Sequence, residues 1–280
     1  MKIALLQDFF AHEIIGGAEK NDSVLFNYLH ASGYEIDCVH TYKVDDLLQK
    51  YDFFIVSNFI RLSDSAKEYM KEKKNYLIYE HDHKYLNNRN PGSFVDFKAP
   101  PTAIINKEFY NCAKKVFVLS KVCKETIEKN LNIDNVHNIA CSLWSTETLD
   151  FIEKINKSSP KKTSEYAILD SKNFVKGTAP ALAFCQKNEI VPTRIASPNY
   201  KEFITQLSEC DKFIFFPQVL ETYSRVCAEA KMLNCKVLTT PKLIGFFSED
   251  YSKLSGAELN YKIRNNIKQA LQKFEQVIFE

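Results

Sequence analysis

Two glutamates eight residues apart, Glu221 and Glu229, have the spacing and surroundings of ligand-binding residues. Residues 213–216 predict a buried strand, residues 224–233 a helix and residues 236–239 a second strand. This parallel crossover places Glu221 in the loop at the carboxyl end of the first strand and Glu229 in the second turn of the helix. Ligands of open parallel sheets bind at that edge, so both acids are candidate site residues. The alternative is an amphipathic helix with solvated glutamates.

Two glycines, Gly16 and Gly17, lie between a predicted first strand at residues 3–6 and an amphipathic helix that carries Leu25 and Leu29 on its inner face. Paired glycines at this place let backbone N–H groups and the positive end of the helix meet an anion. The sequence therefore predicts a phosphate-binding turn here, with a plain glycine turn as the alternative.

Two histidines, His81 and His83, follow a predicted strand at residues 76–79. Alternate residues of a strand point the same way, so the two side chains are expected on one side, where a metal could use them. A metal hydrolase needs further ligands, and the sequence shows no second His/Asp cluster. The remaining reading is a surface histidine at a strand end.

A dinucleotide oxidoreductase is a rival interpretation of a glycine turn after a first strand. That fingerprint needs G-x-G-x-x-G and an acid closing the second strand. Here the glycines are adjacent and the second strand, residues 36–39, ends at His40, which disfavours this class.

Composition sets the remaining bounds. The chain has 280 residues, 45% of them hydrophobic, which favours two α/β domains. A formal net charge of +2 with no long basic run implies neither nucleic acid nor an acidic membrane surface as partner. Eight cysteines without a C-x-x-C pair indicate a reducing compartment. With no leader and no apolar stretch long enough for a bilayer, the expectation is a cytoplasmic protein with no integral membrane segment.

Strands alternate with helices along both halves, which predicts parallel sheets. The polar segment at residues 156–164 is the clearest shift in composition and is the expected linker. The domains are therefore placed at residues 1–150 and 151–280. Apolar residues at helical spacing between Ile263 and Val277 predict a long terminal helix.

The stretch from Pro217 to Ala230 resembles the donor-site motif of retaining GT-B glycosyltransferases of the family 4 type. Pro217, Glu221, Glu229 and Ala230 match that motif, and residues 16–20, GGAEK, are similar to the glycine-rich loop that opens these enzymes. The family usually has Gly-Phe-Gly where this chain has Thr222-Tyr223-Ser224. It also has an arginine before the Lys-Gly that matches Lys176-Gly177, and here Lys172 is the only nearby substitute.

The resemblance implies an α/β GT-B fold of two Rossmann-like, doubly wound domains facing a cleft, with a C-terminal helix returning to the first domain. It implies transfer of a sugar, with retention, from a nucleotide-sugar such as a UDP- or GDP-sugar to a glycan, lipid or protein acceptor. The implied catalytic residues are His81, with His83 as the alternate, Glu221 and Lys176. The implied donor-binding residues are Gly16, Gly17, Lys172, Lys176, Thr222, Tyr223, Ser224 and Glu229.

No Asp-x-Asp pair occurs, so no metal on the diphosphate and no cofactor is expected; lysine and a helix N-terminus would carry that charge. The departures at residues 222–224 and the missing arginine support a second hypothesis. In it the chain is a catalytically degenerate GT-B protein that binds a nucleotide-sugar or a partner without turnover.

Overall fold

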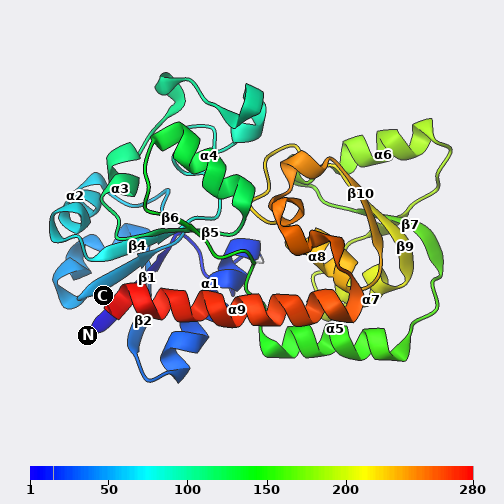
Figure 1. The fold of residues 1–280 in the computed structure, drawn as a ribbon, viewed down its shortest axis with the longest axis horizontal. Coiled ribbons are helices and arrows are strands. Elements are labelled where there is room, and N and C mark those ends of the chain that lie inside the picture. The colour runs from blue at the N-terminus through cyan, green and yellow to red at the C-terminus, as the bar shows by residue number, and fades with distance from the viewer. Residues whose placement is uncertain (15, 280) are drawn as a thin grey trace. The chain divides into compact units, whose positions relative to one another are not determined.

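The computed structural model describes residues 1–14 and 16–279, which form two compact units (Figure 1). The first unit comprises Met1–Trp144 together with residues 266–279, and the second comprises Ser145–Asn265. None of the helices within these described ranges is long and apolar enough to cross a bilayer.

The first unit is built on a six-stranded parallel sheet in the order β2-β1-β3-β4-β5-β6. Its strands are β1 (Lys2–Gln7), β2 (Glu35–His40), β3 (Phe53–Val56), β4 (Tyr76–Tyr79), β5 (Val116–Val118) and β6 (Val136–Asn138). Its α-helices are α1 (Gly17–Ala31), α2 (Asp64–Lys73), α3 (Lys107–Asn111) and α4 (Lys121–Leu131). Short 3-10 turns are η1 (Thr41–Lys43), η2 (Asp45–Lys50), η3 (Pro91–Ser93), η4 (Val95–Phe97) and η5 (Pro101–Ala103).

The chain reverses its direction across this sheet beside β1. From β1 it passes through α1 to β2 on one side, and then to β3 on the other side of β1. The loops that leave β1 and β3 therefore diverge at the carboxyl edge, and such a switch point is where doubly wound sheets bind ligands.

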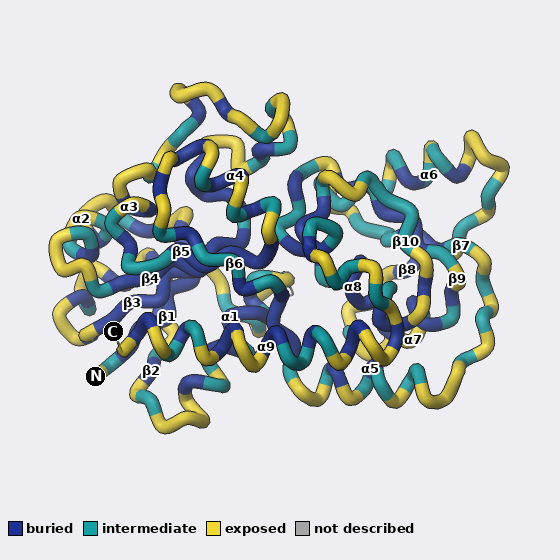
Figure 2. Tube along the Cα trace, in the orientation of Figure 1, coloured by how far each residue is buried: buried dark blue, intermediate teal, exposed yellow. Residues whose placement is uncertain are grey.

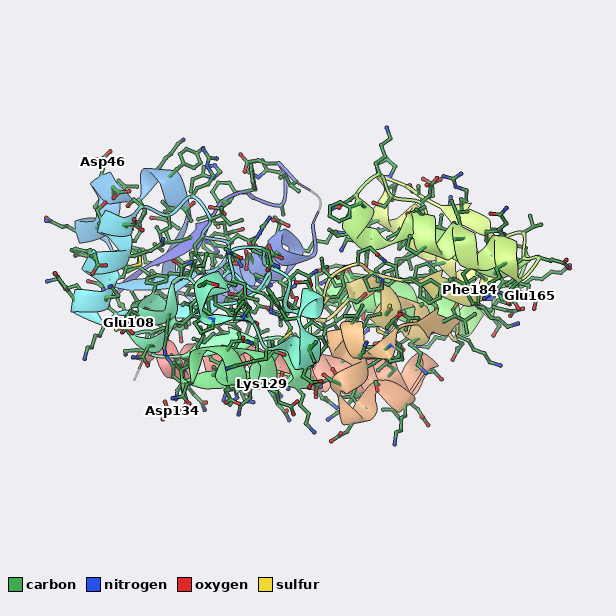
Figure 3. All side chains as sticks on the ribbon, turned by 90° about the horizontal axis from the view of Figure 1, so that it is seen from above. Asp46, Glu108, Lys129, Asp134, Glu165 and Phe184 are labelled. Carbon is green, nitrogen blue, oxygen red and sulfur yellow. The ribbon has the colours of Figure 1, made fainter. Side chains whose placement is uncertain are left out.

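The core of the first unit lies on both faces of the sheet, as its predicted parallel strands require. Every residue of β3, β4 and β5 is buried, and Figure 2 shows these central strands as continuously buried trace. Charged side chains such as Asp46, Glu108 and Asp134 lie on the outside (Figure 3). The buried ionisable acids and bases of this unit instead gather at the strand ends and on the first turns of α1: Asp8, Glu19, Asp22, Glu80, His81, His83 and Lys84.

The second unit has a four-stranded parallel sheet in the order β10-β9-β7-β8, which places its switch point between β7 and β9. The strands are β7 (Ser164–Leu169), β8 (Thr193–Ile195), β9 (Cys210–Phe215) and β10 (Lys236–Thr239). The α-helices are α5 (Thr146–Ser158), α6 (Thr178–Lys187), α7 (Tyr200–Ser208), α8 (Arg225–Met232) and α9 (Gly256–Phe279), which continues into the first unit. The 3-10 turns are η6 (Phe174–Lys176), η7 (Pro241–Leu243), η8 (Gly245–Ser248) and η9 (Asp250–Lys253).

The polar segment at residues 156–164 is not the linker between the units. It forms the end of α5, a loop and the start of β7, all inside the second unit, and the chain changes unit at Trp144–Ser145. Its polarity reflects an exposed loop. Lys162 of this loop still has a structural role, because its Nζ donates to the carbonyl oxygens of Ser208 and Cys210 at 2.8 and 3.0 Å.

The predicted terminal helix is α9, and its apolar stripe is buried as expected. Ile263, Ile267, Ala270, Phe274 and Val277 are all buried. Since residues from 266 onward belong to the first unit, the helix begins in one unit and ends in the other.

Removing the Phe274 ring should destabilise the first unit. Phe274 is fully buried, 4.9 Å from Tyr79 and 4.4 Å from Phe117 between ring centroids. Phe274→Ala should lower the free energy of unfolding by about 3–5 kcal/mol. Urea unfolding followed by the fluorescence of Trp144, the single tryptophan, reports on this unit. The half-exposed Phe279 is the control, and an equal loss in Phe279→Ala would contradict the assignment.

Candidate functional site

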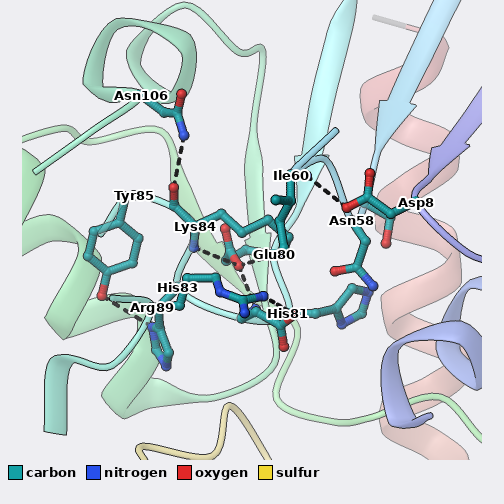
Figure 4. A network of polar contacts seen from close by, with 12 residues as sticks. Asp8, Asn58, Ile60, Glu80, His81, His83, Lys84, Tyr85, Arg89 and Asn106 are labelled. Atoms are coloured by element: carbon teal, nitrogen blue, oxygen red, sulfur yellow. Dashed lines mark hydrogen bonds and ion pairs between the residues drawn. The ribbon is translucent and has the colours of Figure 1, made fainter. Parts of the chain in front are cut away.

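A buried carboxylate, that of Glu80, organises the loop that follows β4 (Figure 4). Its Oε1 accepts from the backbone N–H of Asp82 at 2.6 Å and from Lys84 Nζ at 3.0 Å, and its Oε2 accepts from the Tyr110 hydroxyl. Lys84 is itself buried and lies over the ring of Phe59. The carboxylate thus binds the loop both to its own backbone and to the helix α3.

The pKa of Glu80 shows that its partners outweigh its burial. Burial alone would raise this pKa, but the charge of Lys84 and hydrogen bonds from Tyr110 and the Asp82 N–H lower it to about 2. Glu80 is therefore ionised at neutral pH and forms a buried ion pair with Lys84.

The two candidate histidines of this loop point to different partners. His81 Nε2 lies 3.2 Å from Oδ1 of Asp22 on α1, whereas His83 Nδ1 lies 3.2 Å from the Tyr85 hydroxyl. The strand ends at Tyr79, and His83 has a φ of +56°, so the alternation expected of a strand does not apply. The expectation that both side chains lie on one side is therefore wrong, because they contact different partners. The alternative of a surface histidine is also wrong, because both side chains are buried.

The carboxylate of Asp22, which the sequence did not single out, joins His81 to the strand end of β3. Its Oδ2 accepts from the Ser57 hydroxyl at 2.6 Å, and the side chain is fully buried. Asp8, at the end of β1, accepts from the backbone N–H groups of Ile60 and Arg61 at 2.8 and 3.1 Å. These two acids fix the loop after β3 at the switch point.

The predicted phosphate turn carries an acid of its own. A Cβ on Gly16 would lie 2.0 Å from Oε2 of Glu19, so this carboxylate lies against the glycine at the start of α1. Glu19 Oε1 accepts from Asn58 Nδ2 at 3.2 Å, and burial raises the Glu19 pKa. Gly17 is the first residue of the helix. A diphosphate at these glycines would therefore meet a carboxylate.

In the second unit, Lys176 and Glu221 lie at the switch point of the sheet. Lys176 ends the turn after β7, Glu221 follows β9, and Lys176 Nζ donates to Glu221 Oε1 at 2.8 Å. Gly177 has a φ of +70°, and a Cβ there would lie 1.7 Å from the carbonyl oxygen of Phe216. Only glycine permits this approach, which explains the Lys-Gly pair.

Among the three residues after Glu221, Ser224 has a backbone conformation typical of glycine. Ser224 has a φ of +68° immediately before α8, a conformation that glycine adopts at no steric cost. The Tyr223 side chain is buried and its hydroxyl lies 2.7 Å from that of Tyr251, so it supports the loop from the interior. Thr222 is half-buried, and Lys172 is exposed on the turn before Lys176.

Glu229 is buried inside a cluster that the sequence did not predict. Its Oε1 accepts from the Tyr200 hydroxyl at 2.5 Å and lies 3.7 Å from Arg225 Nε. Burial together with the Glu229 charge raises the pKa of Tyr200 well above its usual range, so the phenol stays protonated and donates. Arg225, in the first turn of α8, also brings a cation to the helix start, close in sequence to Glu221.

The structure therefore groups the predicted residues by unit. Lys176 and Glu221 meet directly, and Glu229 lies on the helix that follows them. His81 of the first unit contacts Asp22 on α1, and Glu19, three residues before Asp22, accepts from Asn58. Long-range partners such as Asp22 and Tyr200 had no local signal in the sequence. Within the described part of the chain, no three His, Cys, Asp or Glu side chains are arranged to hold a metal ion.

Two doubly wound Rossmann-like units define a GT-B fold, and comparison with solved structures agrees. An alpha-glucosyltransferase in complex with UDP and a 13-mer DNA containing a HMU base superposes with a TM-score of 0.52 and 11% identity over 100% of both chains. HepE from Anabaena in complex with UDP and glucose gives 0.56 and 13% over 99% of both. A glycosyltransferase from Rickettsia africae gives 0.51 and 13% over 99% and 98%. The expected fold class is confirmed.

No protein-family model and no curated protein matches the sequence, so the likeness is one of fold. One expectation is nevertheless overturned. The near-neutral charge predicts no nucleic acid as a partner, yet similar structures are those of an alpha-glucosyltransferase in complex with 13-mer DNA. Net charge describes the whole chain and not one face of it, so it does not exclude such a partner.

Loss of the cation at Lys84 should destabilise the first unit in a pH-dependent way. Lys84→Met leaves an uncompensated buried carboxylate and should cost about 3–5 kcal/mol at pH 7. In the wild type, the contribution of Glu80 is complete above its ordinary pKa of 4.5 and is lost as the pH falls from there through about 2. In the variant the pKa rises, so the difference between the two proteins should shrink from pH 7 to pH 4.

Urea unfolding at both pH values, followed by Trp144 fluorescence, checks this prediction. Lys67→Met is the control, because Lys67 pairs with the exposed Asp64 on α2 and its loss should cost at most about 1 kcal/mol. A difference that grows on acidification would contradict the ionised state of Glu80.

Replacing Ser224 by glycine should stabilise the second unit by about 1 kcal/mol, because a left-handed conformation costs a residue with a Cβ roughly 1–2 kcal/mol. Calorimetric thermal unfolding measures the change. Ser224→Ala is the matched control, since it removes the hydroxyl and keeps the Cβ. Equal stability of the alanine and glycine variants would show that the backbone is not strained there.

Proposed function

We propose that this protein is a nucleotide-sugar-dependent glycosyltransferase of the retaining, family 4 type. The observation that carries the proposal is the contact of Lys176 with Glu221 at 2.8 Å, at the switch point of the second sheet. A cation and a carboxylate adjacent at that edge match the two needs of a nucleotide-sugar, a diphosphate and a set of hydroxyls.

The pair is suited to exchange partners when a donor binds. Lys176 is more than a third exposed and Glu221 is 13% exposed, so solvent screens the pair in part and a diphosphate can compete with Glu221 for the lysine. Glu221 is then available to accept from hydroxyls of the transferred sugar. Lysine and the N-terminus of α8 stabilise the charge that develops on the departing diphosphate, and no metal is required in this scheme.

Glu229 is assigned to the ribose hydroxyls of the donor. Tyr200 and Arg225 hold its carboxylate in one orientation, which is a condition for accepting two hydrogen bonds from a diol. Thr222, Ser224 and Lys172 are assigned to the donor loop around it. On the first unit, His81 is assigned a catalytic role, and Asp22 orients its ring.

In a retaining transfer without a carboxylate nucleophile, the sugar passes through an oxocarbenium-like state. The leaving diphosphate oxygen then takes the proton of the acceptor hydroxyl as the new glycosidic bond forms. Similar structures contain UDP or UDP with glucose, so UDP-glucose is the first donor to test, followed by other UDP- and GDP-sugars.

The test is release of nucleoside diphosphate from this donor panel, with and without acceptors, in the presence of excess EDTA. Lys176→Met should lower kcat/KM by about 10- to 100-fold, since a hydrogen bond to a charged group contributes roughly 1.5–3 kcal/mol. Lys187→Met, at the exposed end of α6, is the control and should leave kcat/KM unchanged. Absence of turnover with every donor would favour binding without catalysis, and loss of activity in EDTA would refute metal independence.

A further inference from the structure

Acceptor groups, rather than cations, gather at the switch point of the first unit. Asp8, Glu19, Asp22 and Asn58 are buried there. The buried Lys84 is paired with Glu80, and Figure 4 shows this pair beside Asp8 and Asn58. Carboxylates and amide oxygens accept hydrogen bonds and repel phosphate. The chemistry of this edge is thus opposite to that of Lys176 in the second unit.

Glu19 makes an anion at the start of α1 unfavourable. Its Oε2 lies against Gly16, and the carboxylate accepts a hydrogen bond from its own backbone N–H, so it occupies the positive end of the helix. A phosphate would have to displace this carboxylate from the helix end.

The carboxamide of Asn58 supplies an independent sign of a missing hydrogen-bond donor. Its Nδ2 donates to Glu19 Oε1 at 3.2 Å, which fixes the orientation of the amide, because the flipped amide would turn oxygen toward oxygen. Its Oδ1 is buried and has no hydrogen-bond partner among the described residues, and the whole residue is only 7% exposed. A buried acceptor without a donor costs roughly 1–3 kcal/mol, so a ligand hydroxyl that reaches it gains that energy.

The neighbouring acids are already engaged. Asp22 accepts from Ser57 and contacts His81, and Asp8 accepts from the backbone N–H groups of the loop after β3. Glu19 and Asn58 therefore remain to receive donors from outside, and they are already linked to each other.

We propose that Glu19 and Asn58 form a binding site for two hydroxyl groups of a neutral sugar. The inference rests on the proposed function, which it deepens: the first unit accepts an uncharged, polyhydroxylated ring and rejects a phosphorylated one. The same chemistry could belong to the sugar that receives the transfer or to the sugar of the donor, and experiment separates these sources.

Direct binding tests the site without turnover. Saturation-transfer NMR with the full chain should detect methyl α-glucoside, methyl α-galactoside or methyl α-mannoside, and should detect the matching 6-phosphates more weakly. Three outcomes would overturn the proposal. The 6-phosphate could bind more tightly than its neutral glycoside, glucosamine could bind more tightly than the glucoside, or no neutral glycoside could bind.

Two variants link binding to the named atoms. Glu19→Gln replaces one acceptor by a donor and should lower the affinity for the neutral glycoside about tenfold or more. The affinity for the 6-phosphate should stay the same or increase. A purely structural defect would weaken both probes together. Asn58→Leu should also weaken the glycoside, with Trp144 fluorescence confirming that the unit remains folded.

Matched controls exist on the same unit. Asn75 also has a buried Oδ1 without a partner in the described chain and donates to the Asp52 carbonyl oxygen at 2.8 Å, but it lies at the opposite edge, before β4. Asn75→Leu and the exposed α2 variant Glu72→Gln should bind the glycoside as the wild type does. Weakening by Asn75→Leu equal to that by Asn58→Leu would contradict a site at the carboxyl edge.

Kinetics with UDP-glucose identify the source of the sugar. If the site holds the donor sugar, the glycoside competes with UDP-glucose and Glu19→Gln raises the donor KM; if it holds the receiving sugar, the donor KM is unchanged. Failure of the proposed function is distinguishable, because glycoside binding would then persist and respond to Glu19→Gln in a protein that turns over no donor.

Discussion

The ion pair of Glu80 with Lys84 is the interaction on which the candidate site of the first unit depends. The Glu80 carboxylate accepts from the backbone N–H of Asp82, from Lys84 Nζ and from the hydroxyl of Tyr110 on α3. Because the loop is held in this way, His83 can adopt a left-handed backbone and His81 is delivered to Asp22. A buried charge is costly when it is unpaired, so the loop has one arrangement that satisfies it.

The two units use one architecture for opposite chemistry. In both, the chain reverses beside its first strand and leaves a switch point where two loops diverge. In the second unit this point holds a lysine paired with Glu221, and in the first it holds acids with an amide.

Much of the fold could be predicted from the sequence, because parallel strands are buried on both faces and form short apolar runs. The strand at residues 213–216 and the stripe on α9 are examples. The Lys-Gly pair could also be recognised from the sequence, because the positive φ at residue 177 is a local requirement that glycine meets. The site network could not be predicted, because the partner of His81 lies 59 residues away in the chain and that of Glu229 lies 29 away.

Other misses have equally physical causes. The expectation that His81 and His83 lie on one side requires the strand to continue through both residues. The strand ends at Tyr79, and the Glu80 carboxylate accepts from the Asp82 N–H and turns the backbone there. The polar segment at residues 156–164 resembled a linker because exposed loops and linkers share a composition. The composition of a segment indicates whether it is exposed to solvent, but it does not indicate to which unit the segment belongs.

The division of α9 between the units has a consequence for synthesis on the ribosome. The second unit is continuous in sequence, whereas the first needs residues from 266 onward, including Phe274, to complete its core. Those residues emerge only after the whole second unit has been made. The order of maturation is thus the reverse of the usual N-terminal-first sequence, and the β1–β6 sheet must wait, incompletely covered, for a helix that is translated after the second unit.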